Sequence, residues 1–225
     1  MLNTLDPRAE AVSRKACLDL LRSRLMTSLA PSQAHSLRGL LNGVVLSGEV
    51  VRLSSTGKRD EESAVAAGVS LQSSTSRFRE AFENFLKHLV TPELDDATCE
   101  SGRAMRDAAA LVGPLAQKRH ITVEASSCPP GFPISLPSGA MVTVLAFAAV
   151  EVMKDVADGG RIVFEATTTT SAGARIVVSG GPSLVHTAPV VTLPVALDDA
   201  VAAFGGSRTA VKGSGFSFSI PASNS

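Results

Sequence analysis

Residues 34–42 have the sequence Ala34-His35-Ser36-Leu37-Arg38-Gly39-Leu40-Leu41-Asn42, in which a histidine lies within a helical pattern. Apolar or small residues continue this pattern at spacings of three and four, at Leu37, Leu41, Val44, Gly48 and Val51. Such a seam packs against other helices. On a helix, His35 shares its face with Arg38, Gly39 and Asn42, away from the seam. The pattern predicts a helix from Ser32 to about Leu53, with His35 exposed in the middle of a helical bundle.

The helical pattern extends on both sides of this stretch. A preceding helix is predicted over about residues 9–29, where apolar residues recur at Val12, Leu18, Leu21, Leu25 and Leu29. Pro31 is expected to break this helix or to begin a new one. After a polar loop at 54–60, a helix is predicted over about residues 61–90, with one stripe formed by Phe78, Phe82, Phe85 and Leu89. The two long helices should form an antiparallel hairpin. A single hairpin leaves its stripes half exposed, so we expect a homodimer with a four-helix bundle.

A different pattern follows the hairpin. Pro92 lies in a linker at 91–96 that should end the second helix. Beyond it, helices are predicted at 99–118, 138–156 and 196–204, and strands at 121–125, 161–167, 174–179, 208–211 and 215–220. The helix at 138–156 is apolar on all sides, should be buried, and should stop at Asp158-Gly159-Gly160. This mixed order predicts an α/β sandwich. We therefore expect an α plus α/β protein with a hairpin domain at 1–93 and a sandwich domain at 97–225.

The composition argues against several classes of function. The 21 Lys and Arg residues balance 21 Asp and Glu, and Trp and Tyr are absent, which disfavours a nucleic-acid partner. No apolar run reaches the ~20 residues of a membrane span, and the N-terminus lacks a signal-peptide pattern. The three cysteines, Cys17, Cys99 and Cys128, have no CxxC pair, which argues against a zinc site or a disulfide framework. A cytoplasmic protein without membrane or nucleic-acid partners is expected.

The stretch around His35 resembles the phospho-acceptor segment, or H-box, of bacterial sensor histidine kinases. The match covers His35, Leu37, Arg38 and Leu41. The sequence from Ala97 onward resembles the ATP-binding domain of the same family, at residues 115–121, 154–162, 205–206 and 212–221. This resemblance implies that the hairpin is the dimerisation and phosphotransfer unit and that His35 accepts the phosphoryl group. It also implies that Arg38, Gly39 and Asn42 contact the phosphoryl group or the partner.

The chain departs from the family pattern at the positions that use ATP. Ser36 replaces the acidic base after the histidine, and Gly39 replaces the Thr or Asn of phosphatase-competent members. By position, the catalytic Glu falls on Val150, the Mg²⁺-binding Asn on Glu151 and the adenine-binding Asp near Ser179. Only fourteen residues separate Gly181 from Ala196, too few for the family's lid. The pairs Gly180-Gly181 and Gly205-Gly206 are expected to form turns with positive φ instead of cradling phosphate. The resemblance therefore implies a protein that is not an ATP-dependent kinase.

These observations favour a histidine phosphotransferase of a two-component phosphorelay. It would relay a phosphoryl group between His35 and the aspartate of response-regulator receiver domains, without ATP binding. The receiver would supply Mg²⁺, so no cofactor or metal is expected on this chain. The alternative is a non-catalytic pseudo-histidine-kinase that regulates a kinase or response regulator by binding. The other three histidines lack the spacing of metal ligands. We expect His88 near the end of the hairpin, His120 at a helix-to-strand corner and His186 in a proline-rich loop.

Overall fold

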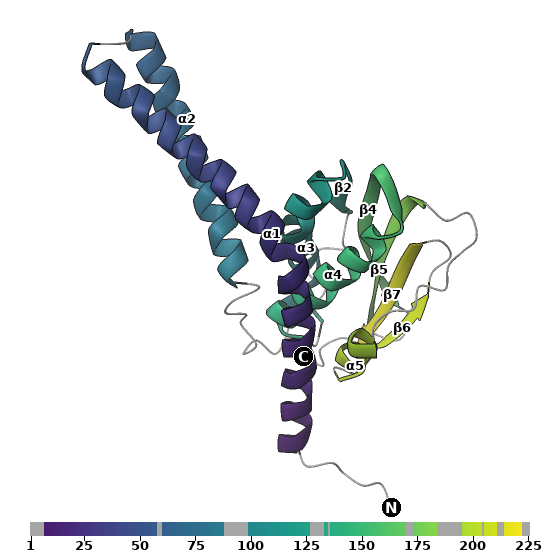
Figure 1. Ribbon diagram of the computed structural model, residues 1–225. Coiled ribbons are helices and arrows are strands. Elements are labelled where there is room, and N and C mark those ends of the chain that lie inside the picture. The colour runs from purple at the N-terminus through teal and green to yellow at the C-terminus, as the bar shows by residue number, and fades with distance from the viewer. Residues whose placement is uncertain are drawn as a thin grey trace, which may run out of the picture.

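The computed structural model describes residues 7–57, 60–87, 99–126, 133–134, 136–169, 173–183, 195–203, 205–210 and 214–221. A long helical hairpin projects from an α/β sandwich, which confirms the predicted fold class (Figure 1). The predicted linker at 91–96 lies outside the described residues. None of the described helices combines the length and apolar character that crossing a membrane requires.

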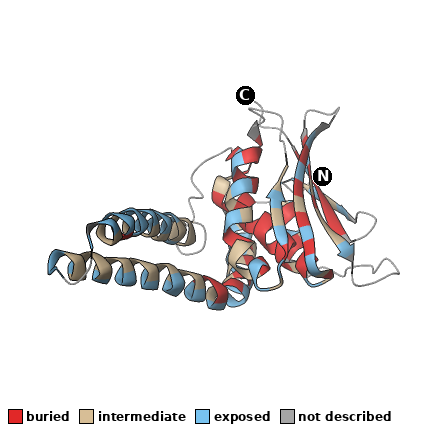
Figure 2. Ribbon diagram, turned by 90° about the horizontal axis from the view of Figure 1, so that it is seen from above, coloured by how far each residue is buried: buried red, intermediate tan, exposed pale blue. Residues whose placement is uncertain are grey.

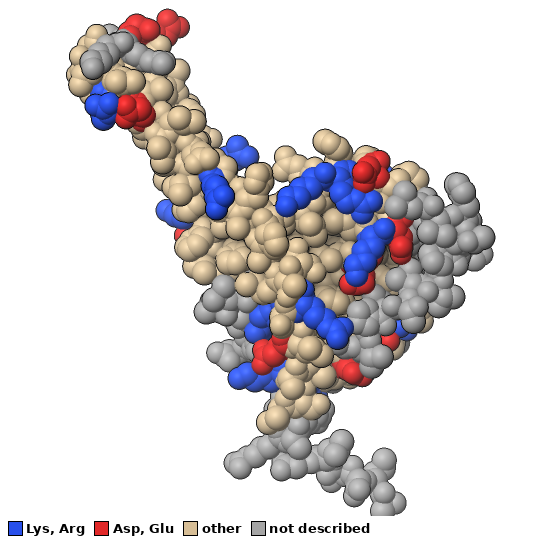
Figure 3. All heavy atoms as spheres, in the orientation of Figure 1, with Lys and Arg blue, Asp and Glu red and all other residues tan. Residues whose placement is uncertain are grey.

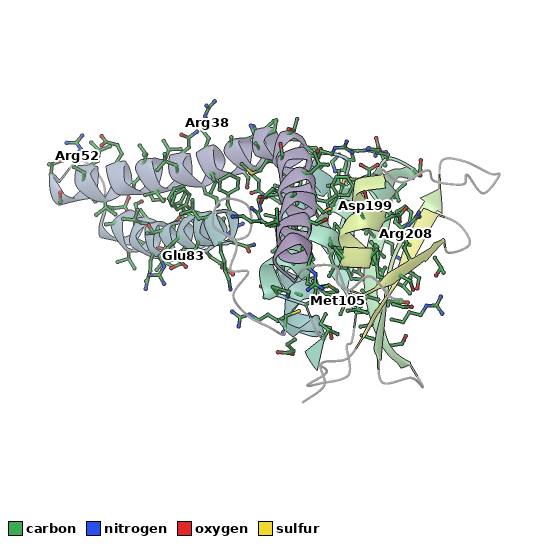
Figure 4. All side chains as sticks on the ribbon, turned by 90° about the horizontal axis from the view of Figure 1, so that it is seen from below. Arg38, Arg52, Glu83, Met105, Asp199 and Arg208 are labelled. Carbon is green, nitrogen blue, oxygen red and sulfur yellow. The ribbon has the colours of Figure 1, made fainter. Side chains whose placement is uncertain are left out.

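Helix α1 (Pro7–Ser55) continues through Pro31, where the sequence suggested a break or a new helix. The helix bends along its length but does not end (Figure 4). A proline inside a helix removes one backbone hydrogen bond and crowds the preceding turn, which explains a bend. Both sides of the bend are held by packing, because Leu29, Ser32 and Gln33 are all buried. This packing keeps the helix continuous despite the proline.

Helix α2 (Glu61–Phe85) runs back along the second half of α1 and completes the hairpin. Its first turn is capped by Asp60, whose carboxylate accepts a hydrogen bond of 2.7 Å from the backbone N–H of Ser63. Ser47 and Ser70 link the two helices through their hydroxyl groups at 3.1 Å. Several large apolar side chains of the hairpin remain exposed in the single chain, namely Leu41, Val45, Leu46, Val65, Val69 and Phe82.

The sandwich contains a five-stranded sheet with the order β2-β4-β5-β7-β6. Its strands are β2 (Thr122–Ala125), β4 (Val156–Thr169), β5 (Gly173–Ser183), β7 (Ser214–Pro221) and β6 (Ser207–Ala210). Strands β2 and β4 are parallel, and the other neighbours are antiparallel. A separate short ladder joins β1 (Cys99–Glu100) to β3 (Pro133–Ile134). One face of the sheet is covered by helices α3 (Ser101–Gln117), α4 (Ser138–Met153) and α5 (Val195–Ala203) (Figure 1).

The main hydrophobic core lies between the sheet and these helices, and the first half of α1 contributes to it. Helix α4 is buried on nearly all sides, as its apolar sequence predicts. Four leucines of α1 are at most 2% exposed and belong to the same core: Leu18, Leu21, Leu25 and Leu29. Figure 2 shows the buried residues concentrated in the sandwich, while the outer hairpin is largely exposed. Helix α1 therefore belongs to both parts of the molecule.

Two expectations for glycine-rich segments were wrong. Helix α4 ends at Met153, and Asp158-Gly159-Gly160 lies inside β4 instead of stopping the helix. There the register with β5 shifts and Gly159 has a φ of +79°, which is the geometry of a β-bulge. Gly180-Gly181 also lies inside a strand, β5, without positive φ. A Cβ on Gly180 would overlap Val156 and approach Val152 to 2.7 Å, so this glycine permits close packing.

The two glycines of the pair Gly205-Gly206 are required for different physical reasons. Gly205 has a φ of +72°, which confirms the predicted turn at that residue. Gly206 does not have positive φ. A Cβ there would lie 2.9 Å from the carbonyl oxygen of Ser219 and 3.0 Å from Val201. Close approach to β7 and α5 therefore explains Gly206.

Candidate phosphotransfer site

His35 lies on α1 at the base of the hairpin, where the helix leaves the sandwich. The preceding turn is fixed, because the buried Gln33 side chain donates a hydrogen bond of 2.6 Å from Nε2 to the carbonyl oxygen of Leu111 on α3. Ser32 is also buried and donates its hydroxyl hydrogen to Leu29. His35 itself is exposed. The sequence placed it in the middle of the bundle, which was wrong because the first half of α1 packs on the sandwich.

The three residues predicted to share the face of His35 are exposed with it, namely Arg38, Gly39 and Asn42. Figure 4 shows Arg38 pointing away from the hairpin. A Cβ on Gly39 would meet no atom within 4 Å, so the surface beside the histidine is open. In the expected apolar seam, Leu37 is half-buried, whereas Leu41 is 46% exposed. The arrangement offers the imidazole and a nearby guanidinium to an approaching partner.

A cavity of about 280 Å³ separates His35 from the sandwich. Its α1 wall is formed by Ser32, His35 and Ser36, and its opposite wall by Pro114, Gln117 and Lys118 at the C-terminal end of α3. Nothing in the sequence assigns Gln117 or Lys118 to a site. They follow His35 by about eighty positions, and only the packing of α1 on α3 brings them to it. No local sequence pattern could have shown this.

A second cavity of about 250 Å³ lies on the other side of Ser36, between the hairpin and α3. It is lined by Gln33, Ser36, Leu40, Arg77, Glu80, Ala81, Asn84, Phe85, Ala110, Leu111 and Pro114. Pro114 has no backbone N–H, so the carbonyl group of Ala110 lacks its usual helical donor. Ser36 therefore lines both cavities, at the position where the family resemblance would place an acidic residue.

The positions that the family resemblance assigns to ATP-binding residues lie in the sandwich. Val150 is buried in α4. Both carboxylate oxygens of Glu151 lie 2.7 Å from the ammonium group of Lys154. Ser179 is paired within the sheet, opposite Val163 and Gly215. Most of the segment between Gly181 and Ala196 lies outside the described residues, so the absence of a lid stays a prediction.

Two segments that carried the family resemblance, residues 115–121 and 154–162, contact each other. Arg119 bonds to Asp158 at 2.7 Å and donates to the carbonyl oxygens of Met153 and Val156 at 2.5 and 2.6 Å. In return, the Arg119 carbonyl accepts from the backbone N–H of Gly159 at 3.0 Å. This cluster ties the corner after α3 to the start of β4. The next residue, His120, lies at that corner as predicted, with a φ of +55°.

The described residues offer little support for other chemistry. Within them, no three His, Cys, Asp or Glu side chains gather closely enough to hold a metal ion. His88 and His186 lie outside the described part of the chain. At the far end of α1, a hydrogen bond from Arg52 lowers the pKa of the Glu49 carboxyl group, but both side chains are exposed and remote from His35. Figure 3 shows basic and acidic side chains scattered over the visible face.

Comparisons with known proteins gave matches only among solved structures. No protein-family model and no curated protein matches the sequence. Full-length ShkA in complex with AMPPNP is 19% identical over 88% of this chain and 46% of that chain, with a TM-score of 0.47. ThkA in complex with the response regulator protein TrrA is 15% identical over 90% of this chain and 64% of that chain, with a TM-score of 0.47.

A histidine kinase from Burkholderia phymatum STM815 is 17% identical over 89% of this chain and 99% of its own, with a TM-score of 0.44. This chain thus spans less than half the length of the ShkA chain and about two thirds of the ThkA chain. The similarity to histidine kinases extends over both the hairpin and the sandwich, at low identity. Because these TM-scores lie below 0.5, function must be argued from the residues of this chain.

Proposed function

We propose that the protein is a dimeric histidine phosphotransferase that exchanges a phosphoryl group between His35 and the aspartate of receiver domains. The observation that carries this proposal is the placement of His35. It is exposed, it follows a turn fixed by the Gln33–Leu111 hydrogen bond, and its helix face is open at Gly39. A nucleophile held in one position and open to a large partner suits phosphoryl transfer, which depends chiefly on positioning and charge stabilisation.

The transfer needs few groups on this chain. A neutral imidazole nitrogen of His35 attacks the phosphorus atom of an aspartyl phosphate, a nitrogen–phosphorus bond forms, and the aspartate leaves as a carboxylate. The reverse reaction passes the group to another receiver. Arg38, one turn from His35, would offset charge on the phosphoryl oxygens or contact the receiver's acidic pocket. The receiver would hold the Mg²⁺ ion.

Relay without ATP is supported by the residues at the aligned nucleotide positions. Ser36 cannot act as the carboxylate base that an attack on ATP uses. Val150 carries no functional group for catalysis, and the Glu151 carboxylate is engaged by Lys154. A carboxylate at position 151, in place of a neutral amide, would also add repulsion beside three phosphates. We therefore expect phosphoryl groups to reach His35 from receivers.

Dimerisation is supported by the exposed apolar side chains of the hairpin. Val45, Val65 and Val69 are each more than 60% exposed in the single chain. Large apolar side chains that recur along both helices of a hairpin mark an interaction surface. A second hairpin of the same sequence would cover them in a four-helix bundle.

The experiment that tests the proposal uses a receiver domain carrying labelled aspartyl phosphate. We expect acid-labile, alkali-stable label on this protein, and no label on the His35→Gln variant. The matched control is His120→Gln, which removes another exposed histidine and should leave the labelling unchanged. Labelling from ATP alone would contradict the proposal. Full signalling by the His35→Gln variant would instead support the pseudo-histidine-kinase alternative.

A further inference from the structure

We infer that the cavity between α1 and α3 receives the phosphoryl group on His35, and that Lys118 of the same chain is its counter-charge. This inference rests on the proposed phosphotransfer function and names the groups that hold the phosphorylated state. The cavity has His35 on one wall and Lys118 on the other, at the C-terminal end of α3.

The size and lining of this cavity suit a phosphoryl group. Its volume of about 280 Å³ exceeds several times the roughly 30 Å³ that one water molecule occupies in the liquid. Besides His35 and Pro114, its lining consists of four polar residues: Ser32, Ser36, Gln117 and Lys118. The Ser32 hydroxyl hydrogen is already donated to Leu29, so the amide of Gln117 and the ammonium of Lys118 are the stronger donors. No carboxylate lines the cavity to repel an anion.

Lys118 differs from the nearby cations because those cations are paired with carboxylates. Lys154 is paired with Glu151, and Arg119 with Asp158. Within the described part of the chain, Lys118 forms no ion pair with a carboxylate. A phosphoryl group carries a charge of about −1.5 to −2 at neutral pH. A lysine ammonium is a compact cation that binds such a group. Its position also offsets the negative end of the α3 dipole.

The fold keeps the two walls of the cavity together. The Gln33–Leu111 hydrogen bond joins α1 to α3 two residues before His35, and both partners are buried. In an in-line transfer, the attacking and leaving atoms occupy opposite sides of phosphorus, and the three other oxygens point sideways. Lys118 can therefore contact a lateral oxygen while the receiver approaches over Arg38 and Gly39. The same contact would stabilise phosphohistidine after the receiver leaves.

Direct phosphorylation with potassium phosphoramidate tests the cavity without any receiver. The imidazole displaces ammonia from phosphorus, so one nitrogen–phosphorus bond forms and another breaks. His88, His120 and His186 are replaced by Gln so that only His35 reacts. The phosphoryl group is then titrated through its second ionisation by ³¹P NMR. We expect Lys118→Gln to lower the second acid-dissociation constant of this phosphoryl group by about threefold, because losing one exposed ion pair disfavours the dianion.

Two variants separate a charge contact from a structural role. Lys118→Arg should retain most of the wild-type titration, because it keeps the positive charge. Lys15→Gln, which removes another exposed lysine of α1 far from His35, should leave the titration unchanged. Identical titration curves for wild type and Lys118→Gln would overturn the inference, as would failure of His35 to react. Neither result bears on the labelled-receiver experiment, which alone decides the proposed function.

Discussion

His35 and Gly39 lie four residues apart on the exposed face of α1, and the sequence predicts some of the histidine's neighbours but not others. The sequence correctly predicted that His35, Arg38, Gly39 and Asn42 are exposed together, because helical spacing alone fixes a shared face. It could not predict Lys118 beside them. That neighbour depends on how α1 packs on α3, which no local pattern encodes.

Gly39 provides a test of access to the histidine. The Gly39→Leu variant should be more stable than wild type by about 0.8 kcal/mol, because leucine favours the helix and meets no atom of the chain. It should nevertheless slow phosphoryl transfer at least about tenfold, a barrier of ~1.4 kcal/mol, since the side chain occupies the receiver's approach. Thermal unfolding and the rate of label transfer from a receiver measure the two effects.

Gly68→Leu on α2 is the matched control. Gly68 also lies in a helix with no atom within 4 Å of an added Cβ. This variant should gain similar stability without slowing transfer. Equal transfer rates for Gly39→Leu and wild type would show that the open surface at Gly39 is not used.

At the scale of elements, the sequence located most helices and strands but misplaced several ends. Proline costs about 3 kcal/mol inside a helix, which made a break at Pro31 the local expectation. Burial of four leucines on one side and of Gln33 on the other outweighs that cost. In the same way, Asp158-Gly159-Gly160 has the composition of a helix stop, but pairing with β5 draws it into a strand.

Arg119 joins elements that are separate in the sequence, and its removal should weaken the whole sandwich. The Arg119→Ala variant leaves the carbonyl groups of Met153 and Val156 without this donor and breaks the pair with Asp158. We expect the free energy of unfolding to fall by about 1–3 kcal/mol. Urea unfolding followed by circular dichroism measures it.

Arg103→Ala is the control for this prediction. Arg103 is an exposed arginine of α3 whose nitrogen lies 3.9 Å from Asp107, four residues away. Such surface pairs contribute little, so a change below about 0.5 kcal/mol is expected. A comparable loss in both variants would mean that the Arg119 cluster has no special role.

At the scale of the whole molecule, hairpin and sandwich share α1. Leu25 on its first half is fully buried in the sandwich core, whereas the nearby Leu20 is 47% exposed. Leu25→Ala should therefore cost about 3 kcal/mol, as truncation of a buried leucine does. Leu20→Ala should cost less than about 1 kcal/mol. Both costs come from urea titrations, and equal values would contradict the packing of α1 on the sandwich.

Charged substitutions on the hairpin test whether its exposed valines form the dimer interface. Replacing Val45 and Val69 together by Asp should give a monomer in light scattering at concentrations where the wild type is dimeric. Charges on these exposed valines would have to be buried in the bundle, at a cost of several kcal/mol each. Val12→Asp changes a valine that is 70% exposed on the first half of α1 and should remain dimeric. A monomeric wild type would refute the four-helix bundle.

The sharing of α1 also has a consequence for the order of events during synthesis. Leu18, Leu21, Leu25 and Leu29 leave the ribosome first, but the surfaces that bury them include α4 and α5, the last of which ends at Ala203. At a synthesis rate of roughly 5–20 residues per second, these leucines remain without their final neighbours for about ten seconds or more. The nascent chain therefore displays an apolar helix until α5 has been synthesised, which exposes this helix to chaperones that bind emerging polypeptides.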